Sequence, residues 1–301
     1  MTQVPYLDAA ELRRLVPMRA AIDAVERLFA EGGVEVPQRA HLDVGGGDLL
    51  VMPAWGGGGV GVKLVTVNPS NPSAGRALVN GVYVLFARES LEPVLMIDGA
   101  AVTALRTPAV SAVATRHLAA PDAATLVLFG AGTQTRGHLE AMRAVRHVSS
   151  VVVIARSPAS AEAFVDEARA ARLDARSGVP EDVRAADIVC TCTTSPTPVF
   201  DGALLRSGAH VNAVGAYKPN ARELDDVTIR RATVVVEDRA AATAEAGDVV
   251  QPLRSGVLDD VLELGEVLRT GRPAGDVTVF KSVGLASEDL AVAAAALEAL
   301  G

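Results

Sequence analysis

The stretch Thr125-Leu-Val-Leu-Phe-Gly-Ala-Gly-Thr-Gln-Thr135 decides the fold of this chain. Its apolar start predicts a buried strand, and its glycines predict a tight turn. A helix is expected from Gln134 to about Arg146, followed by a second strand over Val151–Ala155. Strand, glycine turn, helix and strand form a unit that binds a dinucleotide, because glycines let the pyrophosphate approach and the helix N-terminus offers free N–H groups.

The glycine motif departs from the usual pattern at its third position, where Thr135 stands in place of Gly or Ala. An alternative is a tight turn between buried elements of some other α/β protein. The strand before the motif and the helix after it supply the context that a dinucleotide site requires. We therefore expect the cofactor phosphates to lie over Gly130, Gly132, Thr133 and Gln134.

The end of the second strand bears on the choice of cofactor. An NAD site usually carries an acid there, which accepts a hydrogen bond from the ribose 2′-hydroxyl. This chain has Arg156 and Ser157, which can pair with and donate to a 2′-phosphate. The sequence thus predicts NADPH rather than NADH. The alternative is that Arg156 is an ordinary solvated charge and that the acid comes from elsewhere.

Composition excludes several classes of protein. The chain has 301 residues, enough for two domains, and its formal net charge of −8 argues against nucleic acid as a partner. No apolar run predicts a membrane span, and no signal peptide is evident. Cys190 and Cys192 lie one residue apart in an apolar run and are expected to be reduced residues of the core. We therefore expect a cytoplasmic protein without a metal site.

The remaining hydrophobic patterns predict two parts of different architecture. Residues 1–98 are expected to form a helical start and an antiparallel sheet, with a hairpin around Gly45–Asp48. A helix is predicted over Gly99–Leu118. Beyond it, strands alternate with helices such as Ala221–Arg231, which indicates a parallel, doubly wound sheet. The chain is expected to end in a helix over Ser287–Leu300.

Three basic residues of the first part are candidate ligands for a substrate anion: Arg39, Lys63 and Arg106. Lys63 lies in an apolar strand and Arg106 in a mostly apolar helix, where a charge needs a partner. Together they could hold one carboxylate, since each charge-assisted hydrogen bond contributes about 1.5–3 kcal/mol. The alternative for each residue is a surface charge or a structural ion pair.

An ordered series of short motifs runs through nearly the whole chain. Its segments are Pro37-x-Arg39, Met52-Pro-Ala54, Lys63-Leu-Val-Thr66, Ala104–Ala112, Gly130–Gln134, Val214–Leu224, Glu245–Asp248 and Phe280–Ala286. In this order they resemble the ornithine cyclodeaminase/μ-crystallin family. The resemblance implies an enzyme, usually dimeric, that acts on small α-amino or α-imino acids with a nicotinamide cofactor.

The same resemblance implies the division into domains and further site residues. A Rossmann-type NAD(P)-binding domain, residues 119–286, is inserted into an α+β substrate-binding and homodimerisation domain formed by residues 1–118 and 287–301. Arg39, Lys63 and Arg106 match the residues that bind the substrate carboxylate. The other candidates are Met52, Tyr217 and Arg222 for the substrate, and Thr193, Val214, Gly215 and Ser282 for the cofactor.

Tyr217 stands where the cyclodeaminases of the family carry an aspartate base. A tyrosine, with an ordinary pKa near 10, is a poor base for activating ornithine. The family's ketimine reductases also lack this aspartate, and they resemble the chain in Arg222-Glu-Leu224 and in the arginine at position 156. The pattern favours the reductase branch.

The predicted function is therefore the NADPH-dependent reduction of Δ1-pyrroline-2-carboxylate or Δ1-piperideine-2-carboxylate to the L-amino acid. Lys63 and Arg106 are the predicted catalytic residues, with Lys63 or an ordered water as the proton source. One alternative is an ornithine cyclodeaminase or an alanine- or opine-type dehydrogenase acting on an open-chain substrate. Another is a protein that binds NADPH and a small acid without turnover, in which Arg222 contacts the ligand.

Overall fold

The computed structural model describes residues 4–301, which divide into two compact units. The first unit comprises the described residues up to Val110 together with Gly284–Gly301, and the second is Ser111–Val283. The division falls within helix α3 (Gly99–Leu118), whereas the sequence places the boundary at the end of that helix. The predicted helix itself has the bounds expected from its apolar pattern.

A six-stranded sheet forms the first unit, in the order β1-β6-β5-β4-β3-β2. It is antiparallel, as predicted, except that β1 pairs with β6 in parallel. The predicted hairpin around Gly45–Asp48 joins β2 to β3. The strands are β1 (Tyr6–Leu7), β2 (Ala40–Asp43), β3 (Asp48–Gly56), β4 (Gly59–Val67), β5 (Val79–Phe86) and β6 (Pro93–Asp98).

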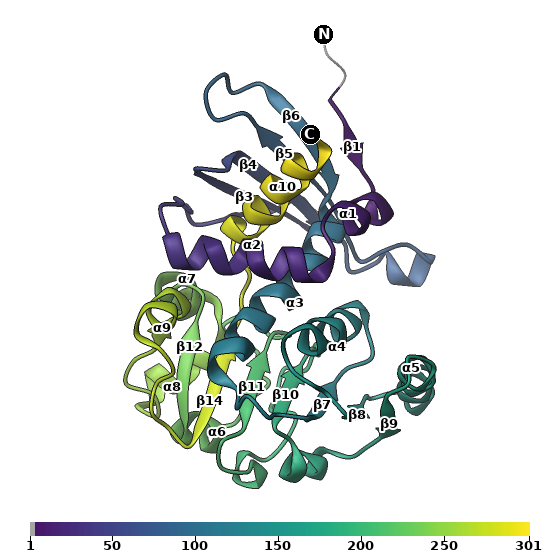
Figure 1. Ribbon diagram of the computed structural model, residues 1–301, viewed down its shortest axis with the longest axis vertical. Helices are drawn as coiled ribbons and strands as arrows, with labels where there is room; N and C mark the ends of the chain where they lie inside the picture. The colour runs from purple at the N-terminus through teal and green to yellow at the C-terminus, as the bar shows by residue number, and fades with distance from the viewer. Residues whose placement is uncertain (1–3) are drawn as a thin grey trace. The chain divides into compact units, whose positions relative to one another are not determined.

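Helices of the first unit cover one face of this sheet. The C-terminal helix α10 (Ala286–Leu300) packs on β3, β4 and β5 and against α2 (Met18–Glu31), as Figure 1 shows. The short helix α1 (Ala9–Leu15) begins with a reciprocal cap, in which the Asp8 and Glu11 carboxylates each accept a hydrogen bond from the other residue's backbone N–H. Along each strand, successive side chains point alternately to the helix-covered face and to the opposite face of the sheet. A single 3-10 turn, η1 (Pro72–Ala74), interrupts the loop before β5.

An eight-stranded, wholly parallel sheet forms the second unit, which confirms the predicted doubly wound architecture. Its order is β13-β12-β14-β11-β10-β7-β8-β9, so the strand order reverses between β7 and β10. Ligands of such sheets bind at the carboxyl ends of the strands beside this reversal. The strands are β7 (Thr125–Phe129), β8 (Ser150–Ile154), β9 (Asp174–Ser177), β10 (Ile188–Thr191), β11 (His210–Ala213), β12 (Ala232–Val236), β13 (Leu262–Glu263) and β14 (Val277–Lys281).

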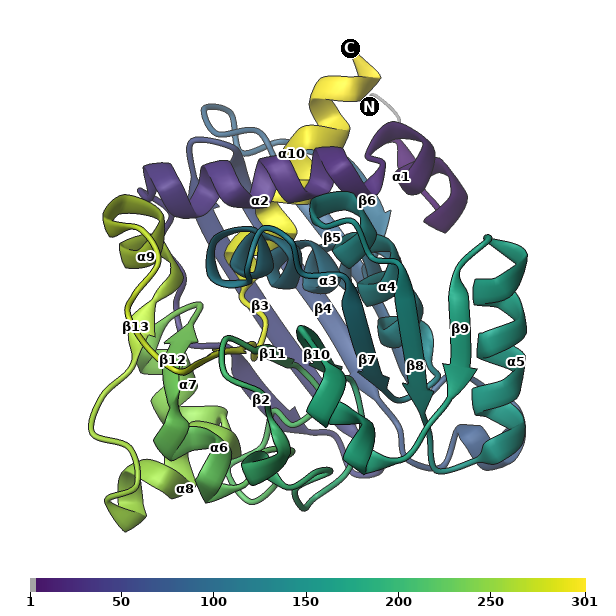
Figure 2. The ribbon, with the colours of Figure 1, turned by 60° about the horizontal axis from the view of Figure 1, so that its bottom comes forward.

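Helices and short 3-10 segments connect these strands. Figure 2 shows β7, β8 and β9 side by side, with α5 packed on β9. None of the helices in the described range 4–301 is both long and apolar enough to cross a membrane. The segments of the second unit are α4 (Thr133–Val145), α5 (Pro158–Ala170), α6 (Asp226–Arg231), α7 (Arg239–Glu245), α8 (Gly247–Ser255), α9 (Leu264–Thr270), η2 (Pro180–Ala185) and η3 (Gly202–Leu204).

The helix predicted over Ala221–Arg231 is wrong in its first half, because α6 begins only at Asp226. Asp225 is its N-cap and accepts a hydrogen bond from the backbone N–H of Thr228. The preceding residues form a turn. Two backbone N–H groups in that turn donate to the carboxylate of Asp248, a partner that local sequence does not reveal.

Arg146, directly after α4, holds the carbonyl end of α3. Its guanidinium donates to the backbone carbonyls of Thr115, Arg116, Ala119 and Ala120. A cation at this end of a helix satisfies the last carbonyls and complements the helix dipole.

Replacing Arg146 with Ala is therefore expected to lower the free energy of unfolding by about 2–4 kcal/mol, measured by denaturant titration. Arg146→Lys is expected to recover little, because lysine lacks the planar fork of donors. Arg143→Ala, at an exposed position of α4, is the matched control and is expected to unfold like the wild type. Equal midpoints for Arg146→Ala and Arg143→Ala would contradict this role.

Candidate active site

A groove of about 860 Å³ lies at the carboxyl ends of β7, β8 and β10. This is the edge at which doubly wound sheets bind ligands, and the volume lies within the range of ligand pockets. The sequence-predicted residues Gly130, Gly132, Arg156, Ser157 and Thr193 all line it. The full lining consists of Phe129–Gly132, Ile154–Ser157, Ser160, Gly178–Pro180, Cys192–Pro196, Pro198 and Val199.

The glycine turn has the geometry that an approaching anion requires. Gly130 has a φ of +108°, and a β-carbon there would lie 2.7 Å from the carbonyl oxygen of Cys192. Gly132 is the N-cap of α4 and makes no side-chain cap, and a β-carbon there would meet open space. The start of α4 thus has no side-chain cap from Gly132, and a helix N-terminus of this kind favours a pyrophosphate. Thr133 and Gln134 form the first turn of that helix.

Arg156 and Ser157 follow β8 at the rim of the groove. The Ser157 hydroxyl caps α5 by accepting a hydrogen bond from the N–H of Ser160 at 3.3 Å, which leaves its own proton for donation. Among the described residues that line the groove, none is acidic. A ribose 2′-phosphate would therefore meet a guanidinium and a hydroxyl there without a carboxylate to repel it.

Two of the predicted cations, Lys63 and Arg106, meet at Asp289 in the first unit. The Lys63 ammonium lies 2.9 Å from the Asp289 carboxylate and 3.1 Å from the Thr103 hydroxyl. The Arg106 guanidinium lies 3.1 Å from Asp289 and 2.7 Å from Glu288. Lys63 is only 1% exposed and Arg106 only 5%, so these charges depend on each other inside the fold.

Burial lowers the pKa of Lys63 to about 8, although the Asp289 carboxylate raises it. Arg106 is a further cation that lowers this pKa. An ammonium with such a pKa is charged at neutral pH yet releases its proton more readily than an exposed lysine. Lys63 thus has the properties of a proton donor.

Arg39 joins the same cluster through the turn at Gly284. Its guanidinium donates to the Gly284 carbonyl oxygen at 3.1 Å. Gly284 has a φ of +74°, and a β-carbon there would lie 2.1 Å from an Nη of Arg106. This turn therefore lies against two of the cations and leaves no room for a side chain.

The other predicted substrate residues lie in different surroundings. Met52 is buried on β3 and pairs across the sheet with Lys63. Tyr217 is 46% exposed in a loop of the second unit, with the Lys218 ammonium 5.8 Å from its ring centre. Arg222 donates to the Asp226 carboxylate at 2.7 Å and to the Leu224 carbonyl at 2.6 Å. Met52 thus lies beside Lys63 in the first unit, whereas Arg222 is bound to neighbouring residues of the second unit.

The remaining predicted cofactor residues follow adjacent parallel strands. Thr193 follows β10, Val214 and Gly215 follow β11, and Ser282 follows β14. The Ser282 hydroxyl donates to the Glu237 carboxylate at 2.5 Å. The carboxyl ends of these strands therefore gather these residues along one edge of the sheet.

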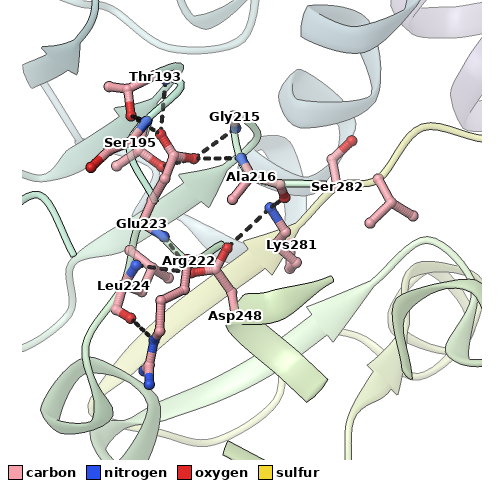
Figure 3. Close-up of polar contacts among 12 residues, drawn as sticks. Thr193, Ser195, Gly215, Ala216, Arg222, Glu223, Leu224, Asp248, Lys281 and Ser282 are labelled. Atoms are coloured by element: carbon pink, nitrogen blue, oxygen red, sulfur yellow. Dashed lines mark hydrogen bonds and ion pairs between the residues drawn. The ribbon is translucent and has the colours of Figure 1, made fainter. Parts of the chain in front are cut away.

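The site residues predicted from the sequence did not include the buried acids that bind the cations of the first unit and the loops of the second. Glu288 and Asp289 are fully buried although they begin an alanine-rich helix, and two adjacent acids in such a helix were the available signal. Glu223 binds the loops that carry Thr193 and Gly215, as Figure 3 shows. Within residues 4–301, no group of three or more His, Cys, Asp or Glu side chains could hold a metal ion.

A family model and known proteins match this chain over nearly its whole length. A model of the ornithine cyclodeaminase/mu-crystallin family matches residues 6–300. A Delta(1)-pyrroline-2-carboxylate reductase of Bacillus cereus is 37% identical over 307 residues, which cover 95% of this chain and 94% of that protein.

Solved structures agree with this similarity. The Delta(1)-pyrroline-2-carboxylate reductase of Thermococcus litoralis, in complex with NADH and L-proline, has a TM-score of 0.92 and 32% identity, covering 98% of this chain and 96% of that one. An archaeal alanine dehydrogenase dimer with bound NAD has a TM-score of 0.93 and 32% identity, covering 98% and 95%. Both likenesses extend over both units of the chain.

Proposed function

Because the chain belongs to the ornithine cyclodeaminase/μ-crystallin family, we propose that it reduces a small cyclic ketimine carboxylate to the L-amino acid. The substrate is Δ1-pyrroline-2-carboxylate or Δ1-piperideine-2-carboxylate, the first of which names the reductases of Bacillus cereus and Thermococcus litoralis. The observation that carries the proposal is the buried cluster of Lys63 and Arg106 on Asp289, in a chain that also has a dinucleotide groove.

The cations have separate tasks in this reaction. Arg106 and Arg39 hold the substrate carboxylate, since a guanidinium can bind it with two parallel hydrogen bonds. Lys63 donates a proton to the imine nitrogen, for which its lowered pKa suits it. The nicotinamide cofactor, when bound, supplies the hydride for the imine carbon. Fixed charges around the carboxylate orient the imine carbon, and positioning of this kind provides much of an enzyme's rate.

NADPH is the proposed cofactor. The support for it is Arg156 and Ser157 at the rim of the groove, together with a described lining that contains no acid. A 2′-phosphate gains a charge-assisted pair with Arg156, whereas a bare 2′-hydroxyl finds no carboxylate acceptor there. The two cysteines of the chain are both free, which fits a reducing compartment, and we propose the cytoplasm.

Product analysis tests the reaction. The purified protein is incubated with NADPH and each ketimine carboxylate, and chiral chromatography is expected to find L-proline and L-pipecolate. L-Ornithine with NAD⁺ or NADP⁺, scored by ammonia release, tests the cyclodeaminase alternative. Pyruvate with ammonia and NADPH or NADH tests the alanine dehydrogenase alternative, which is supported by the similarity to the archaeal alanine dehydrogenase. Tight NADPH binding without any product would favour the binding-protein alternative.

Replacing Gly284 with Ala is expected to reduce kcat/KM for the ketimine by more than about tenfold, because a β-carbon would strain the positive φ and displace the Arg106 guanidinium. Gly271→Ala is the matched control: Gly271 has a similar φ of +87° but open space around the added atom. Steady-state kinetics of both variants make the comparison. Equal loss in both would mean that backbone strain alone acts.

A homodimer formed through the first unit's sheet is the proposed assembly. Helix α10 covers one face of this sheet. The opposite face carries apolar side chains that stay partly or largely accessible, among them Val62 and Leu64 on β4 and Val84, which pairs with Val62 across the sheet. An apolar face of this kind favours association with a second copy.

Val62→Glu is expected to convert the dimer to a monomer, because association would bury an unpaired charge. Size-exclusion chromatography with light scattering measures the mass. Val227→Glu, at an exposed apolar position of α6, is the control and is expected to remain dimeric. A Val62→Glu variant that keeps the mass of the wild-type dimer would place the interface elsewhere.

A further inference from the structure

Glu223 is a fully buried carboxylate between the ends of β10 and β11, and it has no place in the proposed chemistry. Its Oε1 accepts hydrogen bonds from the backbone N–H and the hydroxyl of Thr193, at 2.8 and 2.7 Å. Its Oε2 accepts from the N–H groups of Gly215 and Ala216, at 2.6 and 3.2 Å, and from the Thr191 hydroxyl at 3.0 Å. Figure 3 shows this carboxylate between the two loops.

The loops that Glu223 joins form part of the nucleotide groove. Thr193 and Ser195 line the groove, whereas Glu223 lies behind them. The Thr193 hydroxyl, which donates to Glu223, also accepts from the N–H of Ser195 at 3.1 Å. Gly215 packs against the same loop, since a β-carbon there would lie 2.0 Å from the Thr193 carbonyl oxygen. The position of the groove wall therefore depends on the Glu223 carboxylate.

Two further buried charges, Asp248 and Lys281, hold the backbone of Glu223 and of the Gly215–Ala216 turn. Asp248 on α8 accepts from the backbone N–H groups of Glu223 and Leu224, both at 2.8 Å. The Lys281 ammonium at the end of β14 lies 3.2 Å from Asp248 and donates to the Ala216 carbonyl at 2.5 Å. Residues of β10, α8 and β14 and of the loops that follow β10 and β11 thus form one buried polar network, in which each charge depends on the others being in place.

We propose that Glu223 is a positioning residue that holds the groove wall, Thr193–Ser195, and the turn Gly215–Ala216 in the dinucleotide-binding arrangement before the dinucleotide arrives. The identity of the ligand rests on the proposed function, but the claim that Glu223 holds these loops in place does not. Preformed loops strengthen binding because the ligand does not have to order them. Without the carboxylate, the N–H groups of Gly215 and Ala216 lose their buried acceptor, and the loops must rearrange or admit water.

Glu223→Gln tests this role, because glutamine keeps the size of the side chain but presents an NH₂ group in place of one acceptor oxygen. The dissociation constant for NADPH, measured by calorimetry, is expected to rise by about tenfold or more. Amide hydrogen exchange without ligand is expected to be faster at Thr193, Gly215 and Ala216, and unchanged at Val127 in the sheet core.

Asp226→Asn is the matched control, since it removes the same charge three residues later. The Asp226 carboxylate pairs with Arg222 and is 41% exposed, so this variant is expected to bind NADPH like the wild type. Thr193→Val is a second, milder variant that cuts the link from Glu223 to Ser195. It is expected to speed amide exchange at Ser195 and to weaken NADPH binding by about two- to fivefold.

Three results would decide against the proposals, and they differ. Unchanged NADPH affinity and unchanged loop exchange in Glu223→Gln would overturn the positioning role. Equally accelerated exchange in the loops and at Val127 would assign Glu223 to general stability and would also overturn it. A wild-type protein that binds neither NADPH nor NADH would defeat the proposed function alone, because exchange in the ligand-free protein still tests the loops.

Discussion

Arg106→Met is expected to reduce kcat/KM for the ketimine carboxylate by about a thousandfold. Two charge-assisted hydrogen bonds to the substrate carboxylate, each contributing about 1.5–3 kcal/mol, correspond to a factor of this order. Methionine approximates the length of the apolar part of arginine but offers no donor. The variant also loses the buried contacts with Glu288 and Asp289, so thermal unfolding is measured beside the steady-state rates.

A substrate comparison separates the carboxylate role of Arg106 from its role in the fold. Δ1-Pyrroline, the same cyclic imine without a carboxylate, is expected to be a poor substrate of the wild type and to lose little further in Arg106→Met. Arg116→Met, ten residues later on α3, controls for the side-chain change. If Arg106→Met folds and still reduces the ketimine carboxylate at the wild-type rate, Arg106 does not bind the carboxylate.

Arg156→Asp is expected to shift the ratio of kcat/KM between NADPH and NADH by about a hundredfold or more toward NADH. The change removes the cation proposed to pair with the 2′-phosphate and places there the acid that an NAD site uses to bind the ribose 2′-hydroxyl. Initial rates with both cofactors, at fixed ketimine concentration, measure the ratio.

Arg143→Asp supplies the control for net charge, because Arg143 is exposed on α4 and does not line the groove. This control is expected to keep the wild-type ratio. A wild-type protein that prefers NADH, or an Arg156→Asp variant whose ratio does not change, would show that residues other than Arg156 choose the cofactor.

Much of the fold follows from local patterns in the sequence. The apolar run Thr125–Phe129 and the glycines after it suffice for the strand and turn that open the dinucleotide unit, and the carboxylates of Asp8 and Glu11 suffice for the start of α1. Helix α6 was predicted too long because Arg222-Glu-Leu224 has helix-forming composition. The backbone N–H groups of Glu223 and Leu224 donate instead to the Asp248 carboxylate. A partner so distant in the sequence overrides the local helix propensity.

The site divides in the same way. Lys63 and Arg106 are conspicuous because a charge in an apolar segment requires a partner. Two adjacent acids in an alanine-rich helix are a signal of buried partners, but the pairing itself is not predictable, since Asp289 lies 226 residues after Lys63 and Glu288 lies 182 residues after Arg106. Arg222, a predicted substrate contact, pairs with the Asp226 carboxylate four residues later. Glu223 gave no local signal, because its role appears only when two loops meet.

Transfer of the hydride itself is the most direct test of the proposed reaction. NADPH that carries deuterium at the transferable position of the nicotinamide is supplied with Δ1-pyrroline-2-carboxylate, and the product is examined by mass spectrometry and NMR. The proposed reaction predicts L-proline with deuterium at C2 and matching oxidation of NADPH. Unlabelled proline, or unchanged NADPH with no proline, would contradict reduction of the ketimine by this enzyme.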